Sequence, residues 1–345
     1  MMEEIILYLE RKVKMNNWWK PEIYMKNAPL RQTRGKVIKA IRKYFTKQGL
    51  IEVDTPTLQP APSDEVHLKC FQTGDYYLHT SPELAMKKLL VAGEKAIFQI
   101  CHAYRDEPVS DTHSPEFTML EWYRVGTDYS VMMRDTINVV RMCCKACGVG
   151  ELRHNERTCN PFKRWQKLTV AEAFKKYAGV NLWAKDLRAE AERIGIQCSN
   201  SDTWEDIFFR IMLNRVEYKL GDDVPTILCE YPVQLGALAR AKPNDPKVCE
   251  RFEVYACGVE LCNAFSELTD AKEQRERFVA NYAERKRLYG WDDPMDEDFL
   301  QAHEYGMPDA SGNALGVDRL IMLITGAEKL ADTQWVPCKS EQNML

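Results

Sequence analysis

The stretch "HSPEFTMLEWY", residues 113–123, places Glu116 and Glu121 among aromatic and sulfur-containing side chains that are typical of a protein core. Successive side chains of a β-strand point to opposite faces, so a strand here puts Phe117, Glu121 and Tyr123 on one surface. A charged residue is rarely buried without a partner. Glu121 therefore either faces solvent on an amphipathic strand or has a partner inside the fold, and that partner can be a ligand.

The composition is that of a globular protein. The chain has 345 residues, of which 45% are hydrophobic, enough to build a core in one large domain or two ordinary ones. Its 47 Lys and Arg residues against 51 Asp and Glu residues give a net charge of -4. Nucleic-acid-binding surfaces usually carry an excess of basic residues, so the charge balance counts against tRNA or DNA as the main partner.

The N-terminal residues 1–15 have the apolar spacing of an amphipathic helix. Their apolar run, residues 5–9, is far shorter than the about 18 residues of a membrane span, and the pattern of a signal peptide is missing. Twelve cysteines without a secretory signal indicate the reducing cytoplasm.

One cysteine cluster needs a separate interpretation. Cys143, Cys144 and Cys147 contain a CxxC that could hold zinc together with His154 and Cys159. A second CxxC is missing, however, and small thiols on a helix pack well in a core. Core packing is therefore the better interpretation.

Hydrophobic periodicity predicts helices that alternate with short strands. A helix begins near Leu30 and ends near Gly49, and the strand "LIEVDTP" that follows stops at Pro56. The segment "SPELAMKKLLVAG" predicts a helix with Ser81 as its N-cap and Pro82 as its first residue. Further strands are expected at residues 76–79, 96–104 and 117–123. These elements favour an antiparallel sheet in an α+β domain.

The segment "RFEVYACGVELCNAF" predicts a β-hairpin with Cys257 and Gly258 in its two-residue turn. In that register Tyr255 lies opposite Glu260, and Glu253 is diagonal to Glu260 on the same face. Two carboxylates this close repel each other unless a cation joins them, and Mg²⁺ held by one or two carboxylates plus phosphate oxygens would do so. The alternative is an exposed hairpin face on which both acids are solvated.

Two arginines extend this set of polar residues. The strand "IFQICHAYRDE" places Arg105 and Glu107 on one of its faces, and "GNALGVDRL" leads from a glycine-bearing strand into a helix with Arg319 in its first turn. The missing side chain at Gly316 lets a nucleotide approach, and a guanidinium can bind phosphate or stack on a base. Taken alone, Arg319 is better explained as a surface residue near a helix start.

Together these segments resemble the catalytic core of class II aminoacyl-tRNA synthetases of the lysyl subgroup. The helix from Leu30 into "LIEVDTP" is similar to motif 1, "YRDE" with "HSPEFTMLEWY" to motif 2, and "GNALGVDRLIML" to motif 3. The segments "TSPELAMKKLLVAG", "ERFEVYACGVELCNAFSELTDAKEQ" and "GMPDASG" extend the likeness over nearly all of residues 29–330. The resemblance implies an α+β fold with an antiparallel β-sheet flanked by helices, and a homodimer. It places the catalytic domain at 29–345, with a mostly helical insertion at about 127–220, after an N-terminal helical extension at 1–28.

Within this group the chain resembles the elongation factor P (R)-β-lysyltransferase family, a truncated relative of the lysyl-tRNA synthetases. Fewer than thirty residues precede motif 1, so no N-terminal anticodon-binding OB domain is expected. The segments "FTMLEWYR", "ERFEVY", "MPDASG" and "ALGVDRL" are similar to that family, and Ala314 stands where lysyl-tRNA synthetases usually have Gly. This implies a pocket shaped for (R)-β-lysine over α-lysine.

The resemblance also implies roles for the residues of an amino-acid pocket. Glu121 and Glu267 are expected to receive the substrate ε-ammonium, because a desolvated ammonium needs paired charge and several acceptors. Tyr123 and Asn263 complete that pocket, and Glu83 takes the amino group near the reacting end. The pocket is also expected to include Ser81 and Ala314.

An ATP site is implied next to this pocket. Arg105 and Arg319 are the expected catalytic residues, with Arg105 binding the α-phosphate and the substrate carboxylate. The further ATP contacts implied by the resemblance are Glu107, His113, Glu260, Gly316 and Phe117, whose ring would stack on adenine. The Mg²⁺ ligands are expected to be Glu253 and Glu260.

The implied activity is that of an AMP-forming ligase in the cytoplasm, with ATP and Mg²⁺ as cofactors. It would activate (R)-β-lysine or lysine as an adenylate and transfer it to a lysine ε-amine of elongation factor P. The alternatives are a free-standing synthetase-like enzyme that loads tRNA or a small carrier, and a non-catalytic paralogue. Asp106, Asp111 and Ala264 depart from the family's usual residues, and none of them removes an essential contact.

Overall fold

The computed structural model describes residues 19–337, so the helix expected at residues 1–15 lies outside the described residues. Its main element is an eight-stranded sheet in which the central strands pair antiparallel and only the outermost pairs, β1 with β5 and β9 with β10, are parallel. In spatial order the strands are β1 (Ile51–Glu52), β5 (Ala96–Tyr104), β6 (Glu116–Val125), β15 (Ala310–Gly316), β14 (Val259–Ser266), β13 (Arg251–Ala256), β10 (Thr226–Cys229) and β9 (Gln166–Thr169). This confirms the expected α+β class.

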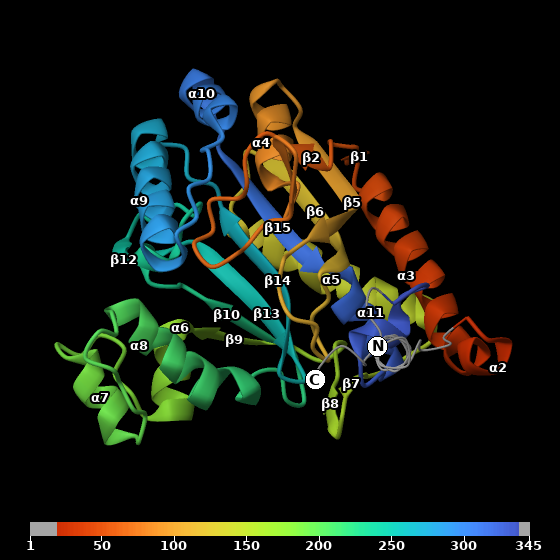
Figure 1. Cartoon of the computed structure of the whole chain (residues 1–345). Helices are drawn as coiled ribbons and strands as arrows, with labels where there is room; N and C mark the ends of the chain where they lie inside the picture. Colours follow the sequence, from red (N-terminus) through yellow and green to blue (C-terminus); the bar gives the residue numbers. More distant parts are fainter. Residues whose placement is uncertain (1–18, 338–345) are drawn as a thin grey trace, which may run out of the picture.

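Three helices cover one face of the sheet, where the main hydrophobic core lies. They are α3 (Ala28–Lys47), α5 (Tyr129–Cys147), which lies behind the sheet in Figure 1, and α11 (Val317–Thr325). The Phe45 ring of α3 lies 5.1 Å from the rings of both Phe98 and Trp122, measured between centroids. Trp122 and its even-numbered neighbours on β6 therefore face this core, as the alternation predicted. Cys143 and Cys144 are buried in the same core.

The opposite face of the sheet is covered at one end only, where α4 (Glu83–Val91), α9 (Ala271–Tyr289) and α10 (Glu297–Gly306) gather (Figure 1). A small sheet of β2 (Leu58–Gln59), β4 (Tyr76–Leu78) and β3 (Gln72–Thr73) lies beside it. The segment that joins β2 to β3 is held against α9, because Arg285 donates hydrogen bonds to the carbonyl oxygens of Glu65 and Leu68 at 2.6 and 3.0 Å. This brings Glu65 to the open part of the face.

The region at about 127–220 contains strands that the sequence did not indicate. Besides α5 it has a hairpin of β7 (Leu152–His154) and β8 (Arg157–Cys159), and β9 joins the main sheet. A second core packs its later elements against β10 and β13. These elements are α6 (Val170–Ala173), the π-helical turn η2 (Phe174–Ala178), α7 (Leu187–Arg193), α8 (Trp204–Ile211), the π-helical turn η3 (Met212–Val216) and η4 (Glu217–Lys219).

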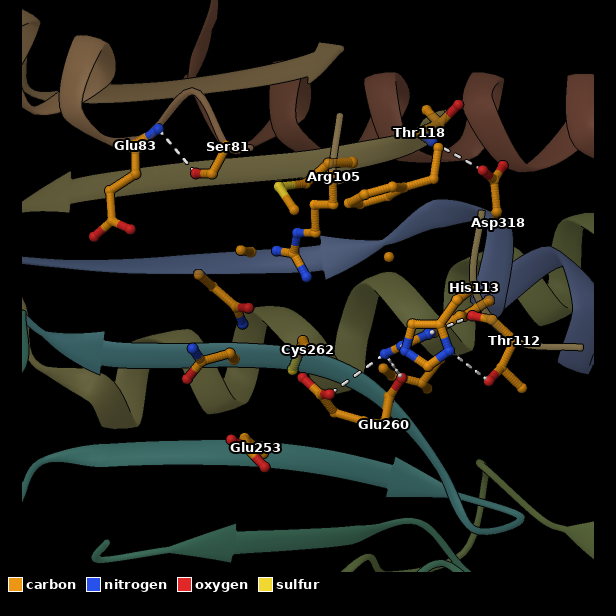
Figure 2. A pocket seen from close by; sticks show the side chains of 18 of the residues that line it. Ser81, Glu83, Arg105, Thr112, His113, Thr118, Glu253, Glu260, Cys262 and Asp318 are labelled. Atoms are coloured by element: carbon orange, nitrogen blue, oxygen red, sulfur yellow. Dashed lines mark hydrogen bonds and ion pairs between the residues drawn. The ribbon is translucent and has the colours of Figure 1, made fainter. Parts of the chain in front are cut away.

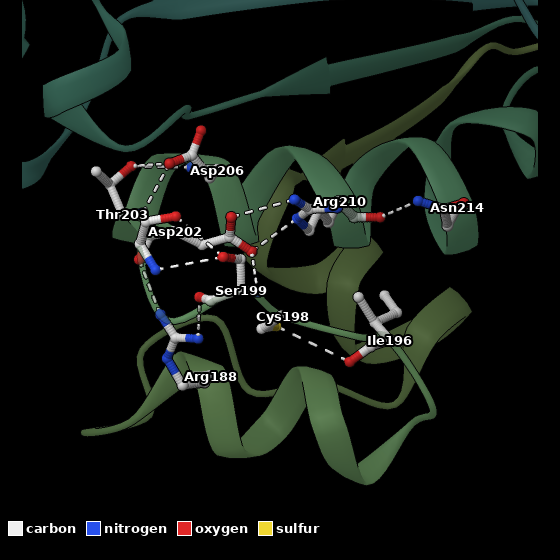
Figure 3. A network of polar contacts seen from close by, with 10 residues as sticks. Arg188, Ile196, Cys198, Ser199, Asp202, Thr203, Asp206, Arg210 and Asn214 are labelled. Atoms are coloured by element: carbon white, nitrogen blue, oxygen red, sulfur yellow. Dashed lines mark hydrogen bonds and ion pairs between the residues drawn. The ribbon is translucent and has the colours of Figure 1, made fainter.

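Polar contacts fix the connection between α7 and α8 (Figure 3). The Thr203 hydroxyl accepts from the Asp206 amide at 3.2 Å while the Asp206 carboxylate accepts from the Thr203 amide at 2.7 Å, which is a reciprocal helix cap. Asp202 pairs with Arg210 at 2.9 Å, and Arg188 donates to the Asp202 carbonyl at 2.8 Å. The start of α8 is therefore well defined, which matters because the helix leads to Glu217 at the edge of the site.

Within residues 19–337, no helix is both long enough and apolar enough to cross a membrane.

Candidate active site

A cavity of about 250 Å³ opens on the sheet face opposite α3, α5 and α11 (Figure 2). Its walls come from β6, β13, β14, β15, the start of α4 and the loop that precedes β6. Of the residues predicted for the site, the lining contains Ser81, Glu83, Arg105, Glu107, His113, Phe117, Tyr123, Glu253, Glu260, Asn263, Ala314, Gly316 and Arg319. Glu121 and Glu267 adjoin the cavity through the contacts described next. The structure thus brings the whole predicted set together.

Glu121 is fully buried and points to the cavity side of the sheet. The Ser81 hydroxyl donates to one carboxylate oxygen, and the Tyr123 hydroxyl donates to the other at 2.8 Å. Burial, reinforced by nearby Glu83, raises the pKa of Glu121 to about 8. The acid in the opening sequence motif is therefore a polar group of the site and not a solvent-facing strand residue.

The start of α4 differs from the prediction by one residue. Pro82 is the N-cap and the helix begins at Glu83, because Pro82 has φ -78° and ψ 3°, outside the helical conformation. Ser81 still acts at this helix start, since its hydroxyl accepts from the Glu83 amide at 3.0 Å (Figure 2). The same hydroxyl contacts Glu121, so the loop before α4 links the two acids.

Lys87 is a buried cation that sequence reasoning missed. Its Nζ lies 2.6 Å from Glu83 Oε1 and 2.6 Å from Glu267 Oε2. Glu267 is fully buried, and its Oε1 has no hydrogen-bond partner within residues 19–337. Burial raises the pKa of Glu267 to about 8, although Lys87 opposes the shift. The only signal in the sequence was the spacing of Glu83 and Lys87 by one helical turn, which is also common on solvated helices.

Strand register places Ala314 between two predicted substrate contacts. On β15 it pairs with Glu121 of β6 on one side and with Asn263 of β14 on the other. Two residues earlier, a Cβ on Gly312 would lie 2.3 Å from a Tyr123 ring carbon and 2.6 Å from Glu267 Oε1. Small residues on β15 therefore leave room for the side chains that form this end of the cavity.

The other end of the cavity carries the two predicted arginines. The Arg105 guanidinium lies 5.1 Å from the centroid of the Phe117 ring and reaches into the cavity (Figure 2). Arg319 donates to the Glu260 carbonyl at 3.1 Å and to its carboxylate at 3.3 Å, and a third contact joins it to His113 Nε2 at 2.9 Å. Burial and the neighbouring Arg319 lower the pKa of His113, so the imidazole is a neutral acceptor.

The hairpin has the predicted turn and the predicted pairing next to it, but a different register further from the turn. Cys257 and Gly258 have φ values of 54° and 75°, and Tyr255 lies opposite Glu260. A β-bulge then shifts the pairing, so that Glu253 lies opposite Asn263 and not diagonal to Glu260. The predicted diagonal pair was wrong, because one extra residue in β14 leaves no mark in the apolar alternation.

The bulge gives Glu253 its own set of partners. Its carboxylate accepts from the hydroxyls of Tyr231 and Tyr255 at 2.5 and 2.6 Å and pairs with Arg251 at 2.8 Å. Arg251, another residue missed in the sequence, also donates to Asn263 Oδ1 at 3.0 Å. A single arginine thus connects the predicted metal ligand to the predicted amino-acid pocket.

The donor set near Glu260 fits Mg²⁺ if phosphate oxygens supply the other ligands. Within the described residues no three His, Cys, Asp or Glu side chains come together as a metal site. Glu260 and Glu253 nevertheless act electrostatically on a third acid, since burial, followed by the charges of these two acids, raises the pKa of Glu217 to about 7. Mg²⁺ is commonly held by one or two carboxylates and phosphates, and Glu260 is the more accessible of the two.

The three residues that depart from the resemblance lie away from the cavity lining. Asp106 is exposed and pairs with Lys69 at 2.5 Å. Asp111 is exposed in the same loop, where its carbonyl accepts from the Leu330 amide at 2.8 Å. Ala264 is buried in the main core. The acids therefore do not face the cavity.

Comparisons with known proteins give one matching family model and several similar proteins. Residues 24–340 match the family model described as tRNA synthetases class II (D, K and N). The chain is 36% identical over 334 residues to an elongation factor P--(R)-beta-lysine ligase of Vibrio parahaemolyticus, covering 92% of this chain and 97% of that protein. It is 37% identical over 337 residues to the ligase of the same name from Vibrio vulnificus, with 92% and 98% covered. A lysine--tRNA ligase of Pelotomaculum thermopropionicum is 35% identical over 319 residues, but the chain spans only 62% of that protein.

Proposed function

This chain belongs to the class II tRNA synthetase family, and from that premise we propose that it is an ATP-dependent ligase that attaches (R)-β-lysine or lysine to a lysine of elongation factor P. Its relatives that align over nearly their whole length carry the name elongation factor P--(R)-beta-lysine ligase. The lysine--tRNA ligase, by contrast, has more than a third of its length outside the match. Loading of tRNA is therefore the second candidate.

The observation that carries the proposal is the charge of the amino-acid pocket. Three buried or half-buried carboxylates, Glu83, Glu121 and Glu267, lie at this end of the cavity. Lys87 is the one cation paired with them among the described residues, and it contacts Glu83 and Glu267. When all are ionised, the group has a net charge of -2. Buried charge of this kind needs compensation, and a substrate with two ammonium groups provides it. Lysine and β-lysine are such substrates, whereas amino acids with uncharged side chains are not.

The nucleotide is proposed to occupy the end of the cavity with the arginines. Arg105 would bind the α-phosphate and the substrate carboxylate, Phe117 would stack on adenine, and Arg319 would contact the outer phosphates. Glu107 and His113 line the same end and are the further ATP contacts proposed. Mg²⁺ would be held by Glu260 and Glu253, and when bound it would neutralise charge on the phosphates.

The first half-reaction follows from this arrangement. A carboxylate oxygen of the amino acid attacks the α-phosphorus of ATP in line, and the bond to pyrophosphate breaks to give the aminoacyl adenylate. The protein supplies orientation and charge stabilisation and needs no nucleophile of its own. Glu83, Glu121 and Glu267 hold the ammonium groups while Arg105 stabilises the charge that develops between the two substrates.

In the second half-reaction, the neutral ε-amine of an acceptor lysine attacks the carbonyl carbon of the adenylate. The bond to AMP breaks, an amide forms, and the amine loses one proton. The cavity is open toward solvent on the sheet face that helices cover only in part, which lets a protein side chain approach. We propose that elongation factor P is the acceptor, that the enzyme works in the cytoplasm, and that it forms a homodimer, for which light scattering should return twice the 40.0 kDa of the chain.

Transfer is tested by incubating the purified protein with elongation factor P, ATP, Mg²⁺ and (R)-β-lysine, followed by intact-mass measurement. The proposal expects a mass gain of one lysyl residue on elongation factor P that needs ATP and disappears when the acceptor lysine is replaced. Charging of tRNA with lysine, without a mass gain on elongation factor P, would favour the second candidate and overturn the first.

A further inference from the structure

Lys87 lies beneath the amino-acid end of the cavity, where it contacts Glu83 of the lining and the adjoining Glu267, although sequence reasoning assigned it no role. Its side chain is only 3% exposed, and its ammonium contacts Glu83 and Glu267 at 2.6 Å each. The ammonium also lies 5.2 Å from the centroid of the Phe265 ring. A lysine is almost never buried this far unless it is paired, and here two carboxylates supply the pairing.

The next residue in the helix shows that this placement is specific. Lys88 points away from the cavity, where it pairs with Asp298 at 2.8 Å and lies 3.5 Å from Asp296. Both lysines stabilise α4 or its packing, but only Lys87 joins two acids of the proposed substrate pocket. The two residues therefore form a natural pair of test and control.

We propose that Lys87 is a positioning and specificity-determining residue for the amino-acid substrate. The inference rests on the proposed function and adds a role for a residue that neither the resemblance nor the names of the relatives assign. Lys87 bridges one acid of each ammonium subsite: Glu83, expected near the reacting end, and Glu267, expected at the far end beside Glu121. The bridge ties α4 to the segment after β14 and so sets the separation between the two subsites.

The bridge has two consequences for selectivity. It removes one of the three negative charges, so the pocket is neutralised by a substrate with two ammonium groups and is left incompletely neutralised by one with a single ammonium group. It also fixes the distance over which those two groups must reach, because Glu83 and Glu267 cannot move apart without breaking a buried ion pair. The pocket therefore selects substrates both by their number of amino groups and by the length of the carbon chain between those groups.

The test compares Lys87→Met with Lys88→Met in ATP-pyrophosphate exchange, using ornithine, lysine, (R)-β-lysine and homolysine. We expect Lys87→Met to raise the KM for the preferred diamino acid about tenfold or more and to flatten the preference among chain lengths by about fivefold or more. The KM for ATP should change by less than about twofold. Lys88→Met should retain both the wild-type KM values and the wild-type preference.

A purely structural role predicts a different pattern. Lys87→Met would then lose activity in equal proportion with every diamino acid, and unchanged preference ratios would overturn the inference. Should Lys87→Met fail to fold, Lys87→Arg supplies the test. Its larger head group keeps the charge but spreads the two acids, so the preference should move toward the longer homolysine. An unchanged preference would overturn the inference. Wild-type protein without exchange for any amino acid would instead contradict the proposed function, and with it this inference.

Discussion

Ala314 pairs directly with Glu121 across β15 and β6, so its methyl group lies in the wall of the cavity beside the carboxylate that is proposed to bind the substrate ammonium. The same residue faces Asn263 on the other side, in β14. A single methyl group at this position is thus placed to affect the shape of the amino-acid pocket without changing its charge.

Ala314→Gly is expected to widen the pocket and raise the ratio of α-lysine to (R)-β-lysine in kcat/KM. One methyl in a pocket typically changes discrimination by about tenfold or more. The measurement is ATP-pyrophosphate exchange with each of the two amino acids. An unchanged ratio would show that the methyl group does not set the preference.

Glu267→Gln is expected to weaken binding of the amino acid while leaving the KM for ATP nearly unchanged. The substitution removes one charge from the ammonium subsite and leaves the opposite end of the cavity intact. Glu304→Gln, which changes an exposed partner of Arg275, is the matched control and should behave as wild type. Equal amino-acid affinity in wild type and Glu267→Gln would rule out this role.

Arg105→Ala is expected to abolish adenylate formation without unfolding the chain. The guanidinium lies in the cavity beside the Phe117 ring, and its Nε has no hydrogen-bond partner within residues 19–337. Its removal therefore costs little internal structure but takes away the proposed phosphate contact. Exchange and thermal unfolding should be measured on the same sample, and normal exchange in this variant would exclude the role.

Binding of the amino acid should become tighter as the pH rises toward about 8. Burial raises the pKa values of Glu121 and Glu267 to about 8 in the free protein, so below that pH these carboxyl groups tend to hold protons. A substrate ammonium needs the ionised form, and binding must then release protons. Calorimetry in buffers of different ionisation enthalpy should detect the protons released on binding. The affinity for the amino acid should stop rising once the pH exceeds about 8. An affinity independent of pH from about 6 to 8 would contradict the assignment.

Arg34→Met is expected to destabilise the fold by about 3–5 kcal/mol. Arg34 of α3 pairs with buried Asp318 of α11, and Asp318 also accepts a hydrogen bond from the Thr118 amide at 2.8 Å. These contacts join the segments that resemble motif 1 (Arg34), motif 2 (Thr118) and motif 3 (Asp318). The variant would leave Asp318 buried without its cation. Arg42→Met, which breaks the exposed pair with Glu52, should change stability by only about 0–1 kcal/mol. Urea unfolding measures both, and equal losses would contradict the argument.

Local sequence patterns predicted the structural features that depend only on residues close together in the chain. The alternation of β6, the turn at Cys257 and Gly258, and the glycine that follows α3 all follow from short-range rules, and the structure confirms them. The resemblance added the set of site residues, which no local rule could assemble, because Ser81, Glu121 and Arg319 come from separate segments.

The sequence could not predict contacts that depend on register or on distant partners. The bulge that moves Glu253 opposite Asn263 comes from one extra residue in an otherwise regular hairpin. Lys87 and Arg251 look like ordinary surface cations of a helix and a strand, and only the folded chain brings them next to Glu267 and Asn263. Strands β7 to β9 are three or four residues long, too short for periodicity to distinguish from loops.

ATP-pyrophosphate exchange with purified wild-type protein and a panel of amino acids tests the central claim most directly. The account predicts strong exchange with (R)-β-lysine, weaker exchange with α-lysine, and none with amino acids that carry a single amino group, such as norleucine. Exchange with norleucine equal to that with lysine, or no exchange with any amino acid, would contradict the claim that Glu83, Glu121 and Glu267 select a diamino acid for activation.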